Sequence, residues 1–454
     1  MSKLFGSSGV RGLTNVELTP NLACKVASAA ATHEQANRAV VACDTRISGG
    51  MFEDAIVSGL VSIGTDVLVL GIVPTPVLAY VAKTLEADVG FMLTASHNPP
   101  QYNGIKVFKR DSLSYTDQDQ DAVERIVGEG SFTFANWRNI GRVSSVNVEQ
   151  VYLNMIFQSV SLKKKWKVVV DSGCGAAFNI APQILTSLGC KVIALNSQPD
   201  GYFPARKSEP TSESLQDLAK TVKALDADIG IAFDGDADRV AFIDEHGTFV
   251  NFDLSLAAYG ALVLKNNGGG ILVTNVEASM CIDKMAERYG GKVVRTKVGD
   301  VYVSEAIKRE HAVFGGEPCG AWVHPQKHLC PDGPLSAALF IAALEEEGKS
   351  VSEFIGEVPE YITTRKNIVS KNEDKYKLVD QLGHVLKSEF PEFIDFSIVD
   401  GVRLALKNGW LLVRASGTEP LIRLTVEGES HQVAKDITAK ATALIHKQIE
   451  ANLK

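Results

Sequence analysis

Three aspartates in one short loop are the strongest chemical signal in the sequence. The segment Phe233-Asp-Gly-Asp-Ala-Asp-Arg239 places carboxylates at positions i, i+2 and i+4 between two apolar runs. Such charges repel one another unless a cation neutralises them, and hard divalent ions prefer oxygen ligands. The spacing therefore favours a metal site made by Asp234, Asp236 and Asp238 over a solvated acidic turn.

Two other roles for this acidic loop make different demands. A calcium-binding EF-hand loop requires glycine at its sixth position, where the chain has Arg239, and it requires flanking helices, so this role is rejected. A phosphatase of the haloacid dehalogenase type begins with Asp-x-Asp-x-Thr or Val after a strand. Asp238 occupies the last of these places. The match is partial and leaves open a phosphatase that uses Asp234 as its nucleophile.

A second segment, Thr94-Ala-Ser-His-Asn-Pro-Pro100, follows an apolar strand and precedes Tyr102-Asn-Gly-Ile-Lys106. Ser96 and His97 are therefore expected at the carboxyl end of a parallel strand, where open α/β sheets bind ligands. Adjacent prolines continue neither a strand nor a helix, so the loop is expected to be stiff and to hold its serine in place. A turn with a capping serine is the alternative interpretation.

Two further loops contain residue types that suit phosphates and sugars. Arg414-Ala-Ser-Gly-Thr-Glu-Pro420, with Arg423 beyond it, combines hydroxyls, a glycine that allows close backbone approach and arginine forks, which suit a phosphate group. Gly315-Gly-Glu-Pro-Cys-Gly320 follows an apolar strand, and its glutamate could accept sugar hydroxyls. Each segment could instead be an ordinary junction between a strand and a turn.

A glycine-rich segment, Gly173-Cys-Gly-Ala-Ala-Phe178, partly matches a dinucleotide-binding fingerprint. Phe178 stands where glycine or alanine is needed, and the following strand ends in Asn196 instead of an acidic ribose ligand. Nicotinamide binding is therefore rejected.

The elements that position these loops follow an α/β pattern. Short apolar, β-branched segments alternate with helix-length segments, and one helix is expected to start with Thr19 as its N-cap and Pro20 at its first position. This alternation predicts parallel α/β units. The predicted strands are 39–44, 65–71, 88–94, 167–171, 191–196, 228–234, 270–276, 292–298 and 312–316.

The C-terminal segment follows a different pattern. Segments 402–406, 410–414 and 421–427 are predicted to form a meander, and a helical pattern runs from about His431 to the end. We therefore predict three consecutive α/β domains with mixed or parallel sheets, followed by a C-terminal α+β domain. The expected domains are 1–150, 151–252, 253–365 and 366–454.

Composition narrows the functional class. With 454 residues, 45% hydrophobic and 22% charged, the chain has the composition of a folded globular protein, and its net charge of −8 disfavours a broad nucleic-acid surface. No apolar run approaches the roughly 20 residues of a membrane span. The seven cysteines are scattered without a CxxC pair, so we expect reduced thiols in a cytoplasmic protein.

Together, in order and over the whole chain, these segments resemble the α-D-phosphohexomutase superfamily. The combination of Thr94–Pro100 with Asp234–Arg239 is very specific. The resemblance implies four domains around a central cleft, each contributing one loop to the active site. Shorter matching segments are Phe5-Gly6 with Val10-Arg11-Gly12, Asp44-Thr-Arg-Ile-Ser48, Pro74-Thr-Pro76, Asp171–Gly175, Thr296-Lys-Val-Gly-Asp300 and Asp332-Gly333.

The resemblance also implies an activity and a set of residue roles. A phosphorylated Ser96 would interconvert hexose 6-phosphates and 1-phosphates through a bound hexose 1,6-bisphosphate, with one Mg²⁺ held by the three aspartates and phospho-Ser96. The implied partner is a small phosphosugar, with neither nucleic acid nor membrane, and the chain would be a monomer or homodimer. The implied catalytic residues are Ser96, Arg11, His97, Lys106 and Arg239. The implied substrate-binding residues are Glu317, Cys319 and Lys297, with Arg414, Ser416, Gly417, Thr418 and Arg423 on the phosphate that is not reacting.

The sugar is a further expectation from the resemblance. Ser416–Pro420 resembles the glucosamine-specific group, whereas enzymes for mannose or glucose more often have asparagine at the second place. Interconversion of glucosamine-6-phosphate and glucosamine-1-phosphate is therefore expected, with mannose or glucose phosphates as the alternative. Ala321 replaces a histidine found in many bacterial relatives, which leaves open a non-catalytic sugar-phosphate sensor; neither His324 nor His328 is assigned as its substitute.

Overall fold

The computed structural model describes residues 3–6, 8–416 and 419–452. Within them, the N-terminal unit is built on a seven-stranded sheet in the order β1-β2-β6-β5-β3-β4-β7. Strands 3, 4, 5 and 7 are parallel, and the other three run antiparallel to their neighbours. The elements are β1 (Phe5–Gly6), β2 (Gly9–Leu13), α1 (Pro20–Glu34), β3 (Arg38–Cys43), α2 (Gly49–Ser62), β4 (Asp66–Ile72), α3 (Thr75–Thr84), β5 (Val89–Leu93), β6 (Tyr102–Lys109), α4 (Asp117–Glu129) and β7 (Val143–Ser145).

The start of α1 follows the sequence prediction. Thr19 Oγ1 accepts a hydrogen bond from the Leu22 amide at 3.3 Å, and Pro20 occupies the first helical position. A proline is tolerated there because its missing N–H would have no partner within the helix.

The second unit contains one sheet in the order β11-β10-β8-β9, in which β11 alone is antiparallel to its neighbour. Val168, Val169 and Val170 are fully buried, so their strand is covered on both faces, as its unbroken apolar run predicts. The elements are α5 (Glu149–Phe157), β8 (Lys167–Asp171), α6 (Ile180–Ser187), β9 (Lys191–Leu195), α7 (Gln216–Ala224), β10 (Ile229–Phe233) and β11 (Val240–Ile243).

The third unit repeats this plan, with a sheet in the order β13-β12-β14-β15 and an antiparallel last strand. Its elements are α8 (Phe252–Asn267), β12 (Gly270–Asn275), α9 (Cys281–Glu287), β13 (Gly291–Thr296), α10 (Asp300–Glu310), β14 (Phe314–Gly316), β15 (Trp322–Val323), α11 (Gly333–Glu347) and α12 (Val351–Ile355). Helix α5 packs against both α3 and α6, and α11 packs against α6, β11 and α8. The first three units are therefore packed together. The boundaries at 150, 252 and 365 stay a proposal, although the first falls inside α5, the second at the first residue of α8 and the third inside β16 (Ile362–Val369).

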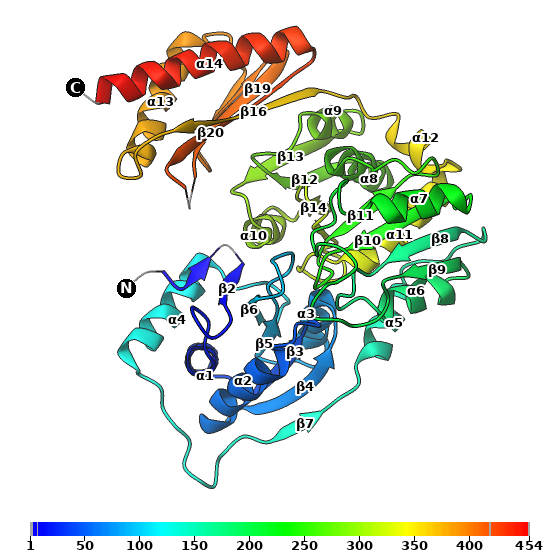
Figure 1. The fold of residues 1–454 in the computed structure, drawn as a ribbon, viewed down its shortest axis with the longest axis vertical. Helices are drawn as coiled ribbons and strands as arrows, with labels where there is room; N and C mark the ends of the chain where they lie inside the picture. The colour runs from blue at the N-terminus through cyan, green and yellow to red at the C-terminus, as the bar shows by residue number, and fades with distance from the viewer. Residues whose placement is uncertain (1–2, 7, 417–418, 453–454) are drawn as a thin grey trace.

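The C-terminal unit is an antiparallel sheet, in the order β16-β20-β19-β18-β17, packed on two helices. It has its own hydrophobic core and lies at one end of the molecule, shown in orange and red in Figure 1. Its elements are β16 (Ile362–Val369), α13 (Lys375–Glu389), β17 (Asp395–Ser397), β18 (Val402–Leu406), β19 (Gly409–Ala415), β20 (Leu421–Gly428) and α14 (His431–Asn452). The predicted class of three α/β domains and a C-terminal α+β domain is confirmed.

The sheets of the first three units are mixed, in agreement with the mixed or parallel sheets predicted, although the α/β alternation alone indicates parallel neighbours. Strands β6, β11 and β15 each run antiparallel to the strand that precedes them in the sequence. A short connection permits this, because only a parallel pair requires a long crossover. Four loops each join two antiparallel neighbours. They are the serine loop (residues 94–101), the aspartate loop (234–239), the Glu317 loop (317–321) and the Arg414 loop (414–420). No helix in the described ranges is both long and apolar enough to cross a membrane.

Candidate active site

Ser96 lies at the carboxyl end of β5, in a backbone conformation that is unusual for a residue with a side chain. Its φ is +50°, in the left-handed region, and the residue is fully buried. Its Oγ donates a hydrogen bond to Asp234 Oδ2 at 2.6 Å and lies 3.3 Å from His97 Nδ1. The structure therefore joins the serine and aspartate loops, which are far apart in the sequence, through one short bond.

The aspartate loop connects β10 to β11 and buries all three of its carboxylates. Each of the three aspartates offers an oxygen within 4.8 Å of the others. Lys106, on β6, reaches them from the N-terminal unit, with its Nζ 2.7 Å from Asp236 Oδ2 and 2.5 Å from Asp238 Oδ2. Thr75 at the start of α3 also donates to Asp236. Two units thus meet at this loop.

Burial and neighbouring charges shift the pKa values of Asp234 and Asp236 in opposite directions. Burial, with the charges of Asp238 and Asp236, raises the pKa of Asp234 well above its usual value. Burial also opposes ionisation of Asp236, but the Lys106 ammonium and its hydrogen bond outweigh burial, and the pKa of Asp236 is lowered. Burial, followed by the charges of Arg239 and Arg11, lowers the pKa of His97 to about 3, so this imidazole is neutral at pH 7.

The donor set fits a divalent cation. Among the described residues, the buried Oδ1 atoms of Asp236 and Asp238 have no hydrogen-bond partner. Buried polar atoms are rarely left in this state without an ion, a water molecule or a catalytic role. Asp234, Asp236, Asp238 and the oxygen of Ser96 supply the hard ligands that Mg²⁺ takes. Bound there, the ion would neutralise charge on a phosphoryl group.

A cavity of about 220 Å³ opens beside this loop and is lined by residues of the first three units. Glu317 is fixed at its wall, because its Oε1 accepts from Asn275 Nδ2 and from the Gly299 amide, both at 2.8 Å. The full lining is Ser8, Arg11, Asp238, Arg239, Asn275, Glu277, Val298, Gly299, Asp300, Glu317, Pro318, Cys319 and Ala321. Arg11, Arg239, Glu317 and Cys319, all proposed from the sequence, are therefore brought to one cavity.

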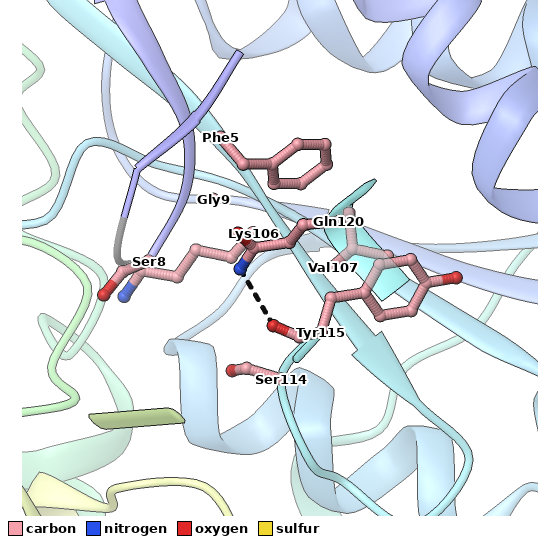
Figure 2. Close-up of a pocket in the computed structure, with 8 residues that line it drawn as sticks. All are labelled: Phe5, Ser8, Gly9, Lys106, Val107, Ser114, Tyr115 and Gln120. Atoms are coloured by element: carbon pink, nitrogen blue, oxygen red, sulfur yellow. Dashed lines mark hydrogen bonds between the residues drawn. The ribbon is translucent and has the colours of Figure 1, made fainter. Parts of the chain in front are cut away.

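A smaller pocket is lined by Lys106 of β6, by residues of β1 and β2 and by Gln120 of α4 (Figure 2). It has space of about 10 Å³, enough for about one water molecule. Gln120 is buried at its wall and donates to the Tyr115 carbonyl oxygen at 2.9 Å. The pocket is too small for a sugar, so the larger cavity is the candidate substrate site.

The C-terminal loop approaches this cavity through Arg414. One amino group of Arg414 is bonded to Glu277, which lines the cavity, and the other lies 2.8 Å from Asp400 Oδ2. Ser416 is buried, and its Oγ accepts from the Glu419 amide at 3.2 Å. Gly417 and Thr418 lie outside the described residues.

Two other proposed substrate residues are not among the residues that line the cavity. The Lys297 side chain is about half exposed, and its Nζ lies 3.9 Å from Asp117 Oδ2. The Arg423 side chain is also about half exposed, with one amino group 3.1 Å from Glu419 Oε2. In this arrangement neither contacts the aspartate loop, and their substrate contacts stay a prediction.

The residues that support the site were not singled out from the sequence. Arg46, Thr75 and Asn275 each bond to a proposed site loop, although only residue-by-residue contacts reveal this. The first two lie in segments that carry the family resemblance, which was the sequence signal that could have pointed to them.

His324 and His328 are buried, and their Nε2 atoms lie 2.9 Å from Ser336 Oγ and 2.8 Å from Asp332 Oδ2, respectively.

Comparison with known families gives the class of protein that this fold and site define. Family models for phosphoglucomutase/phosphomannomutase match residues 2–134 (α/β/α domain I), 150–247 (domain II), 253–361 (domain III) and 366–444 (C-terminal domain). The chain belongs to the phosphoglucomutase/phosphomannomutase family, a family of phosphosugar mutases.

Individual relatives make the comparison narrower. The chain is 41% identical over 450 residues to a probable phosphoglucosamine mutase of Pyrococcus horikoshii, covering 99% of each chain. It is 42% identical over 452 residues to a probable phosphoglucosamine mutase of Methanopyrus kandleri, with the same coverage. A solved phosphoglucomutase/phosphomannomutase family protein of Burkholderia thailandensis superposes with a TM-score of 0.89 at 27% identity, covering 98% of this chain and 97% of that one.

Proposed function

We propose that the protein interconverts glucosamine-6-phosphate and glucosamine-1-phosphate through a phosphorylated Ser96. The observation that carries this proposal is the 2.6 Å bond from Ser96 Oγ to Asp234, inside a buried three-carboxylate loop at the wall of a cavity. A nucleophilic hydroxyl, a fitted cation site and an adjacent cavity are the parts that phosphoryl transfer requires.

The reaction proceeds by two transfers. In the first, the bond between phosphorus and Ser96 Oγ breaks, a bond forms to the free hydroxyl oxygen of the sugar phosphate, and the proton of that hydroxyl passes to Ser96 Oγ as it leaves. The resulting bisphosphate turns round. In the second, Ser96 Oγ takes the phosphoryl group from the other end of the bisphosphate, and its proton passes to the sugar oxygen that leaves. The neutral His97 ring lies 3.3 Å from Ser96 Oγ, so it can hydrogen-bond to that oxygen and orient it without becoming charged.

Positive groups surround the path of the phosphoryl group. Arg11 and Arg239 line the cavity, and Lys106 lies against the aspartates. Phosphoryl transfer depends more on positioning and on neutralising charge than on covalent chemistry, so these groups would supply much of the rate enhancement. Arg414, with Ser416, is proposed to bind the phosphate that is not reacting.

The choice of an amino sugar has its own support. Besides the metal loop, three carboxylates line the cavity: Glu277, Asp300 and Glu317. An ammonium group at the second carbon of glucosamine could pair with one of these carboxylates, whereas mannose and glucose carry no such charge. The names of the two archaeal relatives point to the same sugar.

Phosphorus NMR tests the proposal directly. The protein is incubated with Mg²⁺, a trace of the matching 1,6-bisphosphate and, separately, the 6-phosphates of glucosamine, mannose and glucose; Ser96→Ala is the control. We expect the 1-phosphate of glucosamine to form fastest and the control to be inactive. A preference for mannose or glucose would overturn the sugar assignment. Release of inorganic phosphate without an isomer would favour a phosphatase, and binding without turnover would favour a sensor.

A further inference from the structure

Arg46 lies directly beneath the serine loop and contacts nothing in the cavity. Its side chain is fully buried. Its Nε donates to Asp44 Oδ2 at 3.0 Å, and its two amino groups donate to four main-chain oxygens of the loop. These oxygens belong to Pro99 at 2.7 Å, Tyr102 at 2.9 Å, Ser96 at 2.8 Å and Asn98 at 2.7 Å.

This geometry uses the full donor capacity of a guanidinium. Arginine carries five N–H donors in one rigid plane, and here all five have acceptors at short distance. Carbonyl oxygens in an irregular loop have no partners from a sheet or a helix, and leaving them buried and unpaired is costly. One side chain therefore binds four oxygens along the loop from Ser96 to Tyr102. The Ser208 hydroxyl also donates to the Asn98 oxygen, and the Tyr102 amide to the Pro99 oxygen.

The same network holds Ser96 in its left-handed conformation. The Ser96 carbonyl oxygen accepts from Arg46, while the Ser96 amide donates to Thr94 Oγ1 at 2.8 Å. Thr94 Oγ1 in turn donates to Asp44 Oδ2 at 2.7 Å. Because Asp44 also binds Arg46, both peptide groups of Ser96 are fixed by one closed set of bonds. Such a strained conformation persists only where its surroundings determine it.

The network also fixes the distance to the aspartate loop. A Cβ on Gly235 would lie 2.5 Å from the Ser96 carbonyl oxygen, so the two loops are in close backbone contact at the point where Arg46 holds that oxygen. From the second unit, the ring of Phe203 lies 5.2 Å from the Arg46 guanidinium. A displacement of Arg46 would therefore move Ser96 relative to Asp234.

We propose that Arg46 is a positioning residue for the phosphoryl transfer, which aligns Ser96 Oγ between Asp234 and the substrate hydroxyl. The inference rests on the mutase function proposed above. Arg46 acts through the main chain of the loop and never touches substrate. Lysine keeps the charge but has three donors on a single nitrogen, so it cannot serve five acceptors spread over a plane.

The test compares Arg46→Lys with Arg110→Lys. Arg110 also bonds to a main-chain oxygen and a carboxylate, but its side chain is largely exposed and does not line the cavity. For each variant, kcat and KM are measured, together with Mg²⁺ affinity by calorimetry and the single-turnover transfer from phosphoserine. In Arg46→Lys we expect kcat and the transfer rate to fall about 100-fold, as misplacement by about an ångström produces. KM and Mg²⁺ affinity should stay within about 3-fold of the wild type, because the aspartate loop and cavity remain intact.

Arg46→Ala provides a second readout. Guanidinium ion added in millimolar amounts is expected to restore part of kcat in this variant and nothing in Arg110→Ala. Unchanged kcat in Arg46→Lys, or a parallel loss of kcat, substrate binding and Mg²⁺ binding, would overturn the inference, as would failure of both Arg46 variants to fold. A wild-type protein inactive on every sugar would instead defeat the proposed function, so the two failures are distinguishable.

Discussion

The serine and aspartate loops and the Arg414 loop are held in the molecule by different means. The first two are buried, joined by the bonds of Ser96 and Lys106, and supported by hydrophobic clusters that the first three units share. The Arg414 loop belongs to a unit with a separate core. That unit meets the third through the ion pair of Arg414 with Glu277, the bond from the Val298 amide to Asp400 and a small cluster of Val276, Met280, Trp410 and Leu412. The serine and aspartate loops are therefore held firmly in place. The Arg414 loop, which is proposed to bind the phosphate that is not reacting, is attached through a few contacts that a ligand can exchange.

The largest effect on activity is expected from a substitution in the aspartate loop. Asp236→Asn removes the charge that pairs with Lys106 and that would bind the cation. We expect kcat to fall at least about 1000-fold and Mg²⁺ binding to weaken strongly, because charge neutralisation at the phosphoryl group is lost. Turnover assays and calorimetry measure both quantities. Asp217→Asn, at an almost fully exposed position, is the control. Activity within tenfold of the wild type would contradict the buried site.

A substitution in the Arg414 loop should affect substrate binding more than the chemical step. Arg414→Ala removes a charged group proposed to bind the phosphate that is not reacting, so substrate and transition state lose the same interaction. We expect KM to rise roughly 10- to 100-fold with kcat within a few-fold, since a hydrogen bond to a charged group contributes about 1.5–3 kcal/mol. Arg423→Ala, at a half-exposed position that does not line the cavity, should raise KM less. A fall in kcat alone would place Arg414 in the chemical step.

The serine and aspartate loops could be found from the sequence because their chemistry is written in consecutive residues. Asp234, Asp236 and Asp238 are in one loop, and Ser96 follows a strand that is apolar throughout. Arg46 could not be assigned in this way. Four of its partners are carbonyl oxygens, which every residue has, so residue types do not show that four of its donors meet one loop.

The direction of the strand that follows each loop could not be predicted from the sequence either. The α/β alternation located β10 and β14, but it does not specify the direction of the strand after each loop. Lys106 illustrates the consequence. Its place on β6, antiparallel to β5, brings its ammonium to the aspartate loop of another unit. This depends on how the units pack, and no local pattern records it.

The ion pairs of Arg414 offer a finer test of the exchangeable contact. Asp400 Oδ2 accepts from Arg414 and from the Val298 amide, 3.1 Å away. Asp400→Asn keeps an acceptor but removes the charge that competes with phosphate for Arg414. Because partly exposed ion pairs contribute up to about 1 kcal/mol, we expect KM to fall about 3-fold with kcat unchanged. Asp395→Asn, exposed on β17, is the control. A higher KM would show that Asp400 positions Arg414 for substrate instead.

The smallest expected effect concerns the contact between the third unit and the C-terminal sheet. Two carboxylates meet at the start of α9: Asp253 accepts from the Ser279 amide at 2.8 Å, and Glu427 accepts from the Met280 amide at 2.9 Å. Burial, then the charge of Glu427, raises the pKa of Asp253 from 3.8 to about 6, although the Ser279 hydrogen bond and the charges of Arg365 and Arg295 oppose this. A carboxyl whose pKa is higher in the folded state binds protons more tightly there than in the unfolded chain.

The contribution of Asp253 to stability is therefore fully present below pH 3.8 and is lost as the pH rises through about 6. Asp253→Asn keeps an oxygen that can accept from Ser279 and removes the titration. We expect the variant to unfold a few degrees higher than the wild type at pH 7.5, and the difference to shrink towards pH 5, with kcat unaffected. Thermal unfolding at both pH values measures this. A difference that does not vary with pH would mean that Asp253 titrates normally, and that the contact with the C-terminal unit leaves it accessible to water.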